Sequence, residues 1–216
     1  MKINTDGVLI GSACCQNQPK NILDIGTGTG VIALMLAQRY KNATIDAVEI
    51  DHLAAETAKQ NAAKSPFSSF VKVYNCSYED FNTDKKYDLI VSNPPFFVND
   101  LKNEEERKGI ARHADEDFFA ALIHKSYGLL SDVGSIWLIL PLKQANDVIG
   151  LAASVGLHVI EKVHIYSDKT KPEIRQIICL SKQNDRLNEY DFYIYESLRV
   201  HTAQYKRLLA DFFLAF

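Results

Sequence analysis

The residues best suited to chemistry in this chain are Asn93, Pro94, Pro95 and Phe96, which directly follow an apolar stretch. The Asn93 side-chain oxygen and the Pro94 backbone carbonyl could accept the two hydrogens of a planar amino group. Two such acceptors favour a tetrahedral nitrogen and stabilise the charge that develops as the amine attacks an electrophile. The prolines supply fixed φ angles and no competing N–H donor, and Phe96 could stack on the substrate. This segment therefore predicts a site that activates a planar amine.

A glycine-rich turn upstream predicts the site of the electrophile. Gly26, Gly28 and Gly30 follow a strand pattern and precede a helical one, and glycines allow a tight turn and close approach of a ligand. Their spacing differs from the Gly-x-Gly-x-x-Gly of dinucleotide-binding proteins. Asp24 would repel a pyrophosphate but would suit the cationic methionine end of S-adenosylmethionine. The turn is therefore interpreted as an S-adenosylmethionine site, with NAD or FAD as the main alternative.

Two further strand ends supply candidate cofactor ligands. Glu49 follows the glycine turn by about 20 residues, the position from which an acid accepts both ribose hydroxyls. The alternative for Glu49 is a surface acid at a strand tip. Ser77 and Tyr78 follow a third strand and would lie beside the adenine ring, with Tyr78 covering it and Ser77 or Asp80 meeting its amino group. An aromatic residue at this place could equally pack in the core.

Strands that end at one edge of a sheet would bring these residues together. Strand patterns alternate with helical patterns at 31–40, 51–64, 116–130 and 143–155. The expected strands are 21–25, 44–50, 70–75, 87–92, 134–140, 157–166 and 174–181. This order predicts an α/β fold with a doubly wound, mostly parallel, seven-stranded sheet whose last two strands form an antiparallel pair. An Asn-Pro pair alone is often a simple turn, but a strand end in such a sheet favours the catalytic interpretation.

The chain organisation expected from the sequence is one domain spanning 1–216. Residues from about 183 to 216 form a C-terminal extension packed on this domain, with an aromatic helix or tail from 203 onward. The polar segment 97–115 is long for an ordinary connection and is predicted to be a mobile substrate loop. A solvated loop or a short surface helix is the alternative for this segment.

The composition limits the partners and the compartment. Hydrophobic residues make up 47% of the 216 residues, and no run approaches the roughly 20 apolar residues of a membrane helix. The start of the chain shows no export signal, which predicts a cytoplasmic protein. A net charge of −3 neither supports nor excludes nucleic acid, because a local patch can bind phosphates. No Cys-x-x-Cys pair occurs, so no metal site is expected and reduced thiols are predicted at Cys14, Cys15, Cys76 and Cys179.

Several of these motifs together resemble a known group of enzymes. Leu23 to Gly30, Glu49 and Asn93 to Phe96 resemble the class I S-adenosylmethionine-dependent amino-methyltransferases, which include adenine-N6 enzymes and the release-factor glutamine enzymes. Other stretches look like the bacterial enzymes that methylate adenine N6 in valine tRNA next to the anticodon. These stretches are Thr5 to Gly11, Asn93 to Phe97 with Ala111 to His113, Lys171 to Arg175, and His201 to Tyr205 with Asp211 to Leu214.

The resemblance implies roles for individual residues. Asn93, Pro94 and Phe96 would be catalytic. Cofactor binding would fall to Thr5, Asp24, Gly26, Gly28, Gly30, Glu49, Ser77, Tyr78 and Asn93. Substrate binding would fall to Pro95, Phe97, Arg112 and His113. Arg112 and His113 could bind phosphate or, equally, form a cap or salt bridge within their own segment. Lys169, Lys171 and Arg175 are a second RNA-facing candidate, with solvated strand ends as the alternative.

The activity implied by the resemblance is methyl transfer from S-adenosylmethionine to the exocyclic N6 of an adenosine in tRNA. The target base would be flipped out of its stack and would lie against Phe96. The partner would be tRNA, and a monomer is expected. The nearest alternative is a protein-glutamine N5-methyltransferase of the release-factor type, although those enzymes generally carry an N-terminal helical domain for which this chain has no room. DNA adenine methylation would need a target-recognition domain, and binding without catalysis is disfavoured because the transfer residues are intact.

Overall fold

A computed structural model describes residues 5–95 and 106–213, with the backbone alone described for 106–116. Helices and strands alternate up to residue 75 and again from 87 to 166, after which strands follow one another up to residue 201. The strands are β1 (Asn21–Ile25), β2 (Thr44–Glu49), β3 (Val71–Asn75), β4 (Tyr87–Ser92), β5 (Leu130–Leu140), β6 (His158–Tyr166), β7 (Glu173–Ser181), β8 (Asn188–Tyr193), β9 (Tyr195–Ser197) and β10 (Val200–His201). The helices are α1 (Thr5–Ala13), α2 (Val31–Arg39), α3 (His52–Lys64), α4 (Glu106–Leu129), α5 (Leu142–Ser154) and α6 (Ala203–Leu209).

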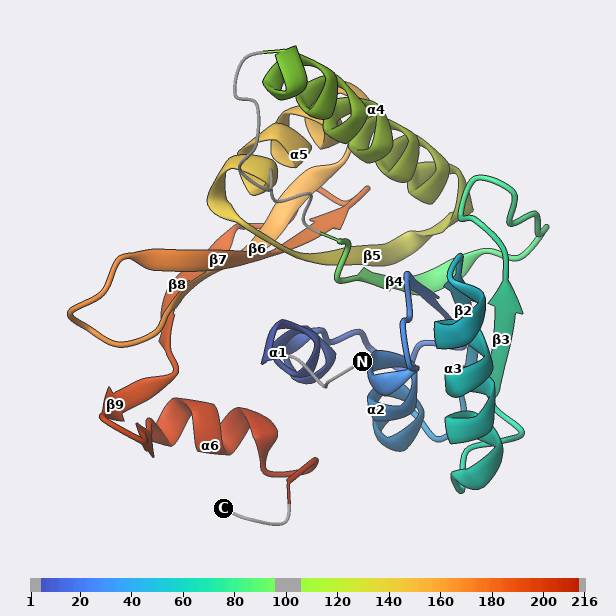
Figure 1. The fold of residues 1–216 in the computed structure, drawn as a ribbon, viewed down its shortest axis with the longest axis horizontal. Coiled ribbons are helices and arrows are strands. Elements are labelled where there is room, and N and C mark those ends of the chain that lie inside the picture. Colours follow the sequence, from blue (N-terminus) through green and yellow to red (C-terminus); the bar gives the residue numbers. More distant parts are fainter. Residues whose placement is uncertain (1–4, 96–105, 214–216) are drawn as a thin grey trace.

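The central sheet has the strand order β3-β2-β1-β4-β5-β7-β6-β8 (Figure 1). The strands from β3 to β5 in this order are all parallel. β7 is antiparallel to both β5 and β6, and β8 is parallel to β6. The predicted doubly wound, mostly parallel sheet with an antiparallel pair near its end is therefore confirmed.

The predicted number of strands is wrong, because the central sheet has eight strands rather than seven. The additional strand is β8, which forms an edge, and only Phe192 among its six residues is buried. A strand with so few buried positions lacks the alternation of apolar and polar residues that marks a strand in a sequence. The short β9 and β10 form a separate antiparallel pair that was not predicted either.

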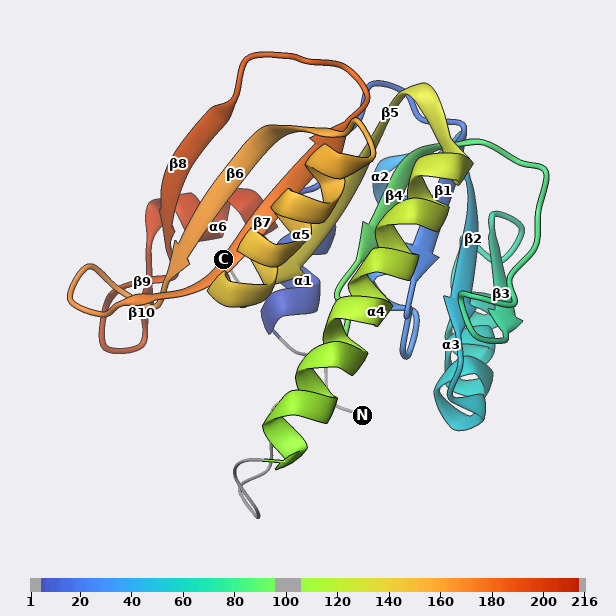
Figure 2. The same ribbon diagram turned by 90° about the horizontal axis from the view of Figure 1, so that it is seen from above.

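Helices cover both faces of the sheet. α1, α2 and α6 lie on one face, and α4 and α5 lie on the other (Figures 1 and 2). Because successive side chains of a strand point to opposite faces, Leu89 packs with α1 and α2, whereas Ile90 packs with α4 and α5. None of the helices in the described ranges is long and apolar enough to cross a membrane.

Several helix boundaries follow from local residues. Asp51 was predicted to cap α3, and its side chain accepts a hydrogen bond from the Ala54 N–H at 2.7 Å. Gly156 was predicted to stop α5, and it has a φ of +84°, which favours glycine. The loop predicted over 97–115 is wrong in part, because α4 already begins at Glu106. The sequence assigned no element to residues 5–13, which form the mostly buried α1.

The strands that carry the predicted site residues end next to one another. Ile25 at the end of β1 pairs with Val48 of β2 on one side and with Ser92 of β4 on the other. Glu49 at the end of β2 pairs with Asn75 at the end of β3. The segments that follow β1, β2, β3 and β4 therefore meet at one edge of the sheet, where open α/β sheets bind their ligands.

Candidate active site

A cavity of about 700 Å³ lies at the carboxyl ends of β1 to β4. This volume is in the range of small-molecule sites. Its walls come from the segments that follow the four strands and from one face of α4. The lining includes Gly26, Thr27, Gly28, Thr29, Glu49, Ile50, Cys76, Ser77, Tyr78, Ser92, Asn93, Pro94, Pro95, Phe118, Ala121 and Leu122. The fold therefore brings the glycine turn and the Asn-Pro-Pro segment to the same cavity.

The glycine turn has a backbone that only glycine adopts readily. Gly26, Gly28 and Gly30 have φ values of +69°, +58° and +86°. The amide of Gly26 donates a hydrogen bond of 2.9 Å to the Val48 carbonyl at the end of β2. Gly26 and Gly28 line the cavity. Gly30 instead packs on α3, since a Cβ there would lie 3.3 Å from the Cβ of Ala58.

Asp24 lies behind the glycine turn and not in the wall of the cavity. Its side chain is fully buried, and Oδ2 accepts hydrogen bonds from the Thr27 hydroxyl at 2.5 Å and the Ala33 N–H at 3.0 Å. Oδ1 has no hydrogen-bond partner among the described residues. Burial raises the pKa of the Asp24 carboxyl to about 7. The geometry thus gives Asp24 a part in holding the turn against α2.

Glu49 is a buried acid that lines the cavity, and its carboxylate can accept further hydrogen bonds. Its Oε2 accepts the Gly28 N–H at 2.8 Å, and its Oε1 accepts the Asp51 N–H at 2.9 Å. Each carboxylate oxygen can accept two hydrogen bonds. Both oxygens of Glu49 are therefore held in place by the backbone and can each accept one more donor from a ligand.

Ser77 and Tyr78 both line the cavity after β3. The Ser77 hydroxyl donates to Asp80 Oδ2 at 2.7 Å and accepts the Asp80 N–H at 3.0 Å, which forms a closed turn. The Tyr78 hydroxyl lies 3.1 Å from the hydroxyl of Ser126 on α4. Burial raises the pKa of Tyr78 to about 12, so its hydroxyl stays protonated at neutral pH. The Tyr78 ring is thus fixed between the end of β3 and α4.

The Asn-Pro-Pro segment begins where β4 ends. Ser92 donates a hydrogen bond of 2.8 Å from its hydroxyl to the Ile25 carbonyl. Because Ile25 and Ser92 are partners in the sheet, the glycine turn and Asn93 start side by side. Asn93, Pro94 and Pro95 all line the cavity. This adjacency places two candidate acceptors next to the turn that was predicted to hold the electrophile.

The remaining predicted residues stand apart from this cavity or outside the description. Thr5 begins α1 and does not line the cavity, whereas Gly7 of the same helix does. Phe96 and Phe97 lie outside the described residues. Arg112 and His113 lie in α4, within the stretch where only the backbone is described.

Sequence reasoning missed part of the wall. Ile50 is 72% exposed although apolar, and it lines the cavity directly after Glu49. An apolar residue after an acidic strand end was the available signal for it. Phe118, Ala121 and Leu122 come from α4, and only the packing of that helix over the strand ends reveals them. In the described part of the chain, no three His, Cys, Asp or Glu side chains gather as a metal site would require.

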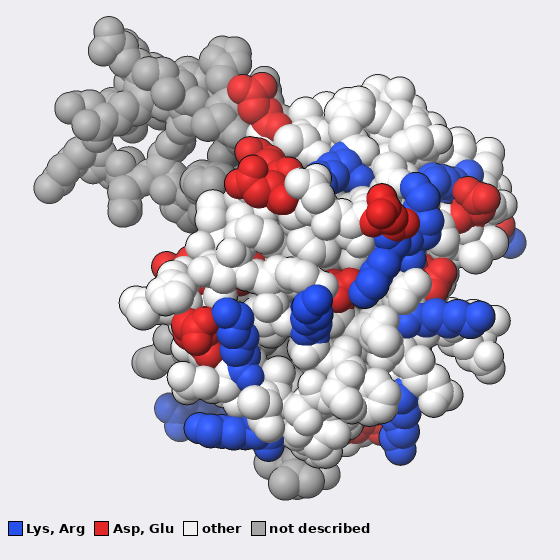
Figure 3. Space-filling view, turned by 90° about the vertical axis from the view of Figure 1, so that its right-hand side faces the viewer, with Lys and Arg blue, Asp and Glu red and all other residues white. Residues whose placement is uncertain are grey.

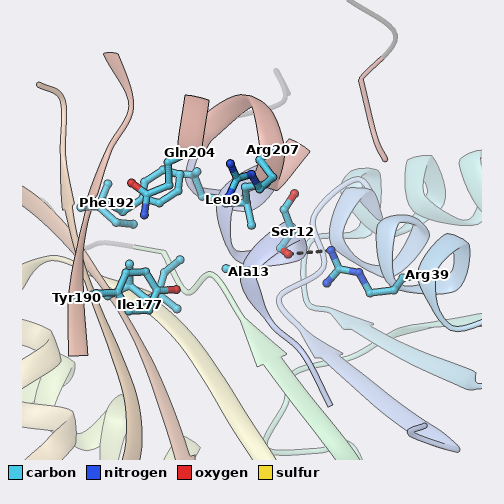
Figure 4. A pocket seen from close by; sticks show the side chains of 12 residues that line it. Leu9, Ser12, Ala13, Arg39, Ile177, Tyr190, Phe192, Gln204 and Arg207 are labelled. Carbon is cyan, nitrogen blue, oxygen red and sulfur yellow. Dashed lines mark hydrogen bonds between the residues drawn. The ribbon is translucent and has the colours of Figure 1, made fainter. Parts of the chain in front are cut away.

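A second cavity, of about 360 Å³, lies under α6 (Figure 4). Side chains of α1 and α6 face those of β7 and β8 across it, and the Arg39 guanidinium donates to the Ser12 carbonyl at 2.7 Å. The Ser12 hydroxyl is buried and has no hydrogen-bond partner among the described residues. None of the predicted site residues whose side chains are described lines this cavity.

Comparison of the sequence with known proteins finds similarity to methyltransferases. The model of the methyltransferase small domain family matches residues 8–162. A relative from Pedobacter heparinus, named tRNA1(Val) (adenine(37)-N6)-methyltransferase, is 55% identical over 216 residues, covering 100% of this chain and 92% of the relative. A relative of the same name from Trichodesmium erythraeum is 39% identical over 220 residues, covering 100% of this chain and 92% of that protein.

The fold is also similar to solved structures. A predicted O-methyltransferase from Agrobacterium tumefaciens superimposes with a TM-score of 0.73, and the match covers 96% of each chain. The two sequences are 16% identical, so this likeness concerns the fold alone.

Proposed function

The chain belongs to the methyltransferase small domain family and to the tRNA1(Val) (adenine(37)-N6)-methyltransferases, and on that premise we propose how its residues act. It transfers a methyl group from S-adenosylmethionine to the exocyclic N6 of an adenosine in tRNA, namely the adenosine of the valine tRNA anticodon loop. One observation carries the proposal. The glycine turn after β1 and Asn93 after β4 are direct neighbours in the wall of one cavity.

The residues of the cavity fit S-adenosylmethionine. When bound, this cofactor supplies an electrophilic methyl group on a sulfonium. Glu49 would accept the two ribose hydroxyls with its two oxygens, because each has capacity for one more hydrogen bond. Ile50 and Tyr78 would flank the adenine ring, and Ser77 would lie at its edge. Gly26 and Gly28 would allow the backbone to approach the methionine end, in a turn that Asp24 holds.

The amine is prepared by acceptors from the Asn-Pro-Pro segment. The Asn93 side-chain oxygen and the Pro94 carbonyl would accept the two N–H groups of the adenine amine. They hold the nitrogen lone pair toward the cofactor and stabilise the positive charge that develops on nitrogen. No base has to act first, since the nitrogen can lose its extra proton after the new C–N bond has formed. Asn93 would thus contact both the substrate amine and the cofactor end of the cavity.

The target base would enter the cavity from an anticodon loop. Bases in such a loop are already partly exposed, so flipping one out costs less than in a duplex. We assign the base pocket to Pro95, Phe96 and Phe97, and the nearby phosphate contacts to Arg112 and His113. We further propose that residues 1–216 act as one cytoplasmic domain and as a monomer, with 183–216 as its packed extension.

Methyl transfer to RNA tests the proposal directly. The protein is incubated with labelled S-adenosylmethionine and bulk tRNA from bacteria that lack this modification, and the RNA is digested and analysed by mass spectrometry. N6-methyladenosine in the valine tRNA fraction is the expected product, and Asn93→Ala should not form it. In the same reaction with release factor added, label in release factor with none in tRNA would overturn the proposal in favour of a glutamine N5-methyltransferase. The same reaction with isolated valine tRNA then maps the position.

A further inference from the structure

Two segments far apart in the chain form a joint protrusion. One is the β6–β7 loop (residues 167–172), and the other is the β9–β10 hairpin (residues 195–201). The Tyr195 N–H donates to the Ser167 carbonyl at 2.8 Å, and the Ile194 N–H donates to the Tyr166 carbonyl at 3.0 Å. The rings of Tyr166 and Tyr193 stack with centroids 5.0 Å apart. Figures 1 and 2 both show the two segments side by side.

This protrusion lies at the same edge of the sheet as the active-site cavity. β4 and β5 are parallel, and β7 is antiparallel to both β5 and β6, so β6 runs in the direction of β4. The end of β6 at Tyr166 therefore faces the same way as the end of β4 at Ser92. Three steps between strands separate β4 from β6, which is a sideways distance of about 14 Å at the usual strand spacing. The register places Ser92 level with Lys162, so Tyr166 lies four residues further along β6 than the end of β4. A nucleic acid with one base in the cavity could reach this protrusion with its flanking backbone.

The protrusion carries three exposed basic side chains. Lys169, Lys171 and Arg199 are exposed, and none forms an ion pair with a described residue. The adjacent acid, Asp168, accepts hydrogen bonds from the Thr170 N–H and hydroxyl within the loop. Glu173, which follows the loop directly, has its carboxylate oxygen Oε1 at 2.7 Å from the ring nitrogen Nδ1 of His164. The acids on either side of the lysines are thus engaged locally.

Several other basic residues form ion pairs with nearby acids. Arg175, the third basic residue of this region, forms an ion pair of 2.9 Å with Asp6 of α1. Lys59 pairs with Glu56 on α3, and Lys85 pairs with Asp46, both at 2.7 Å. On the side of the molecule that carries β3 and α3, basic and acidic side chains are interspersed (Figure 3). Arg175, Lys59 and Lys85 are thus held by carboxylates, whereas no ion pair holds Lys169, Lys171 or Arg199 among the described residues, although the hairpin also carries the exposed acid Glu196.

The hairpin tip is exposed and held in an unusual conformation. Leu198 is 90% exposed, and Arg199 has a φ of +62°, in the left-handed region that a residue with a Cβ rarely adopts. The base of the hairpin is fixed, because the His201 ring stacks on Tyr195 at 4.9 Å and on Tyr205 at 4.4 Å. Ser197 and Val200 are paired, so Leu198 and Arg199 form a two-residue turn, and a turn of this kind accounts for the positive φ at its second position.

We propose that the β6–β7 loop and the β9–β10 hairpin form a tRNA docking surface that binds the backbone flanking the anticodon loop. Lys169, Lys171 and Arg199 neutralise phosphates, and Leu198 contacts a ribose or an exposed base. The cations supply sequence-independent affinity, as phosphate contacts do in general, while the cavity selects the adenosine. This inference rests on the proposed function, because it assigns the partner of the same active site.

The test compares two triple variants with the same change of charge. Lys169→Ala/Lys171→Ala/Arg199→Ala removes the docking cations. The control, Lys20→Ala/Lys41→Ala/Lys64→Ala, removes three exposed lysines from segments that precede strands β1, β2 and β3, at the opposite edge of the sheet. The docking variant should raise the KM for valine tRNA at least tenfold and leave kcat within twofold. The control should keep the wild-type KM, and both variants should keep the wild-type affinity for S-adenosylmethionine.

Salt dependence gives a second readout that folding alone would not change. The slope of log Kd for tRNA against log salt should fall by about 2, since each lost phosphate contact removes roughly 0.7 to 0.9. Arg199→Gly removes one cation while relieving the left-handed strain, so it should fold at least as well as wild type and still raise the KM about threefold. An unchanged KM and slope, or an equal effect in the control, would overturn the docking surface.

The failures of the two proposals can be told apart, because tRNA binding and methylation are measured separately. A wild-type protein that binds tRNA through these cations but forms no N6-methyladenosine would contradict the proposed function and leave the docking surface standing. A wild-type protein that methylates tRNA while the docking variant binds and turns over normally would contradict the docking surface alone. A wild-type protein that does not bind tRNA would overturn both.

Discussion

The cavity at the carboxyl ends of β1 to β4 and the cavity under α6 are built from different parts of the same sheet. The first is lined by the segments in which strands end and backbone turns begin. The second is lined mainly by side chains from within strands, such as Val163, Ile177 and Phe192, and by the faces of α1 and α6. Residues within a strand have their backbone groups in the sheet, whereas strand ends have backbone and side-chain polar groups to offer to a ligand.

This difference explains why the two cavities should respond differently to mutation. At the strand ends, Glu49 and Asp24 are buried acids that hold the glycine turn, and Asn93 stands beside that turn. Under α6, the polar group that is buried without a partner in the described structure is the hydroxyl of Ser12. We therefore expect changes in the first cavity to affect binding and chemistry, and changes in the second to affect stability alone.

The largest effect is expected for Asn93→Ala. This change removes one of the two acceptors for the substrate amine, which should lower kcat by about 10²- to 10³-fold, as the loss of a single transition-state acceptor or donor does. The affinity for S-adenosylmethionine should stay within a few-fold. Single-turnover methylation of tRNA and calorimetric titration of the cofactor measure the two quantities.

Asn146→Ala is the matched control, since Asn146 is an exposed residue on α5. It should leave both the rate and the cofactor affinity unchanged. If Asn93→Ala loses cofactor affinity as strongly as it loses rate, Asn93 acts in cofactor binding and not on the amine.

Glu49→Ala should weaken cofactor binding more than it slows transfer at saturation. Its two oxygens would each lose a charge-assisted hydrogen bond, and the Gly28 N–H would lose its acceptor. We expect the Kd for S-adenosylmethionine to rise by at least about 100-fold, because each of the two lost hydrogen bonds to a charged group contributes roughly 1.5 to 3 kcal/mol. Calorimetry compares this variant with Asp147→Asn, an exposed acid on α5. A Kd within threefold of wild type would show that the ribose is bound elsewhere.

The strand-end cavity was largely predictable from sequence, because its parts are local. A glycine turn, an acid after a strand and an Asn-Pro pair each mark a strand end within a few residues, and β1 and β4 have the predicted bounds of 21–25 and 87–92. The wall that α4 contributes was not predictable, since Phe118 and Leu122 reach the cavity only through packing. β8 was not predicted from the sequence for a related reason, because an exposed edge strand has few apolar residues in an alternating pattern.

Asp24→Asn tests whether the buried acid behind the glycine turn costs stability. Burial raises the pKa of this carboxyl from its ordinary 3.8 to about 7. Between these two values the folded protein holds a proton that the unfolded chain has released, so the stability of wild type falls as the pH rises toward 7. Asparagine resembles the protonated acid and avoids this loss. The unfolding free energy of the variant minus that of wild type should therefore increase by about 2 kcal/mol when the pH is raised from 5.5 to 8.

Urea unfolding without cofactor at pH 5.5, 6.5 and 8 measures this difference. Asp147→Asn changes an exposed acid, and its unfolding free energy should differ from that of wild type by the same amount at all three pH values. A constant difference for Asp24→Asn as well would mean that Asp24 ionises at its ordinary pKa, and that burial behind the turn is not costly.

The smallest effect is expected for Ser12→Ala in the cavity under α6. The Ser12 side chain is 4% exposed, and its hydroxyl lacks a partner among the described residues. A buried hydroxyl without a hydrogen bond costs free energy, and alanine also favours the helix, so the variant should gain up to about 1 kcal/mol in unfolding free energy. Methyl transfer should be unchanged, although α1 also contributes Gly7 to the active-site cavity. A stable variant with impaired transfer would show that α1 couples the two cavities, and the distinction between them would then fail.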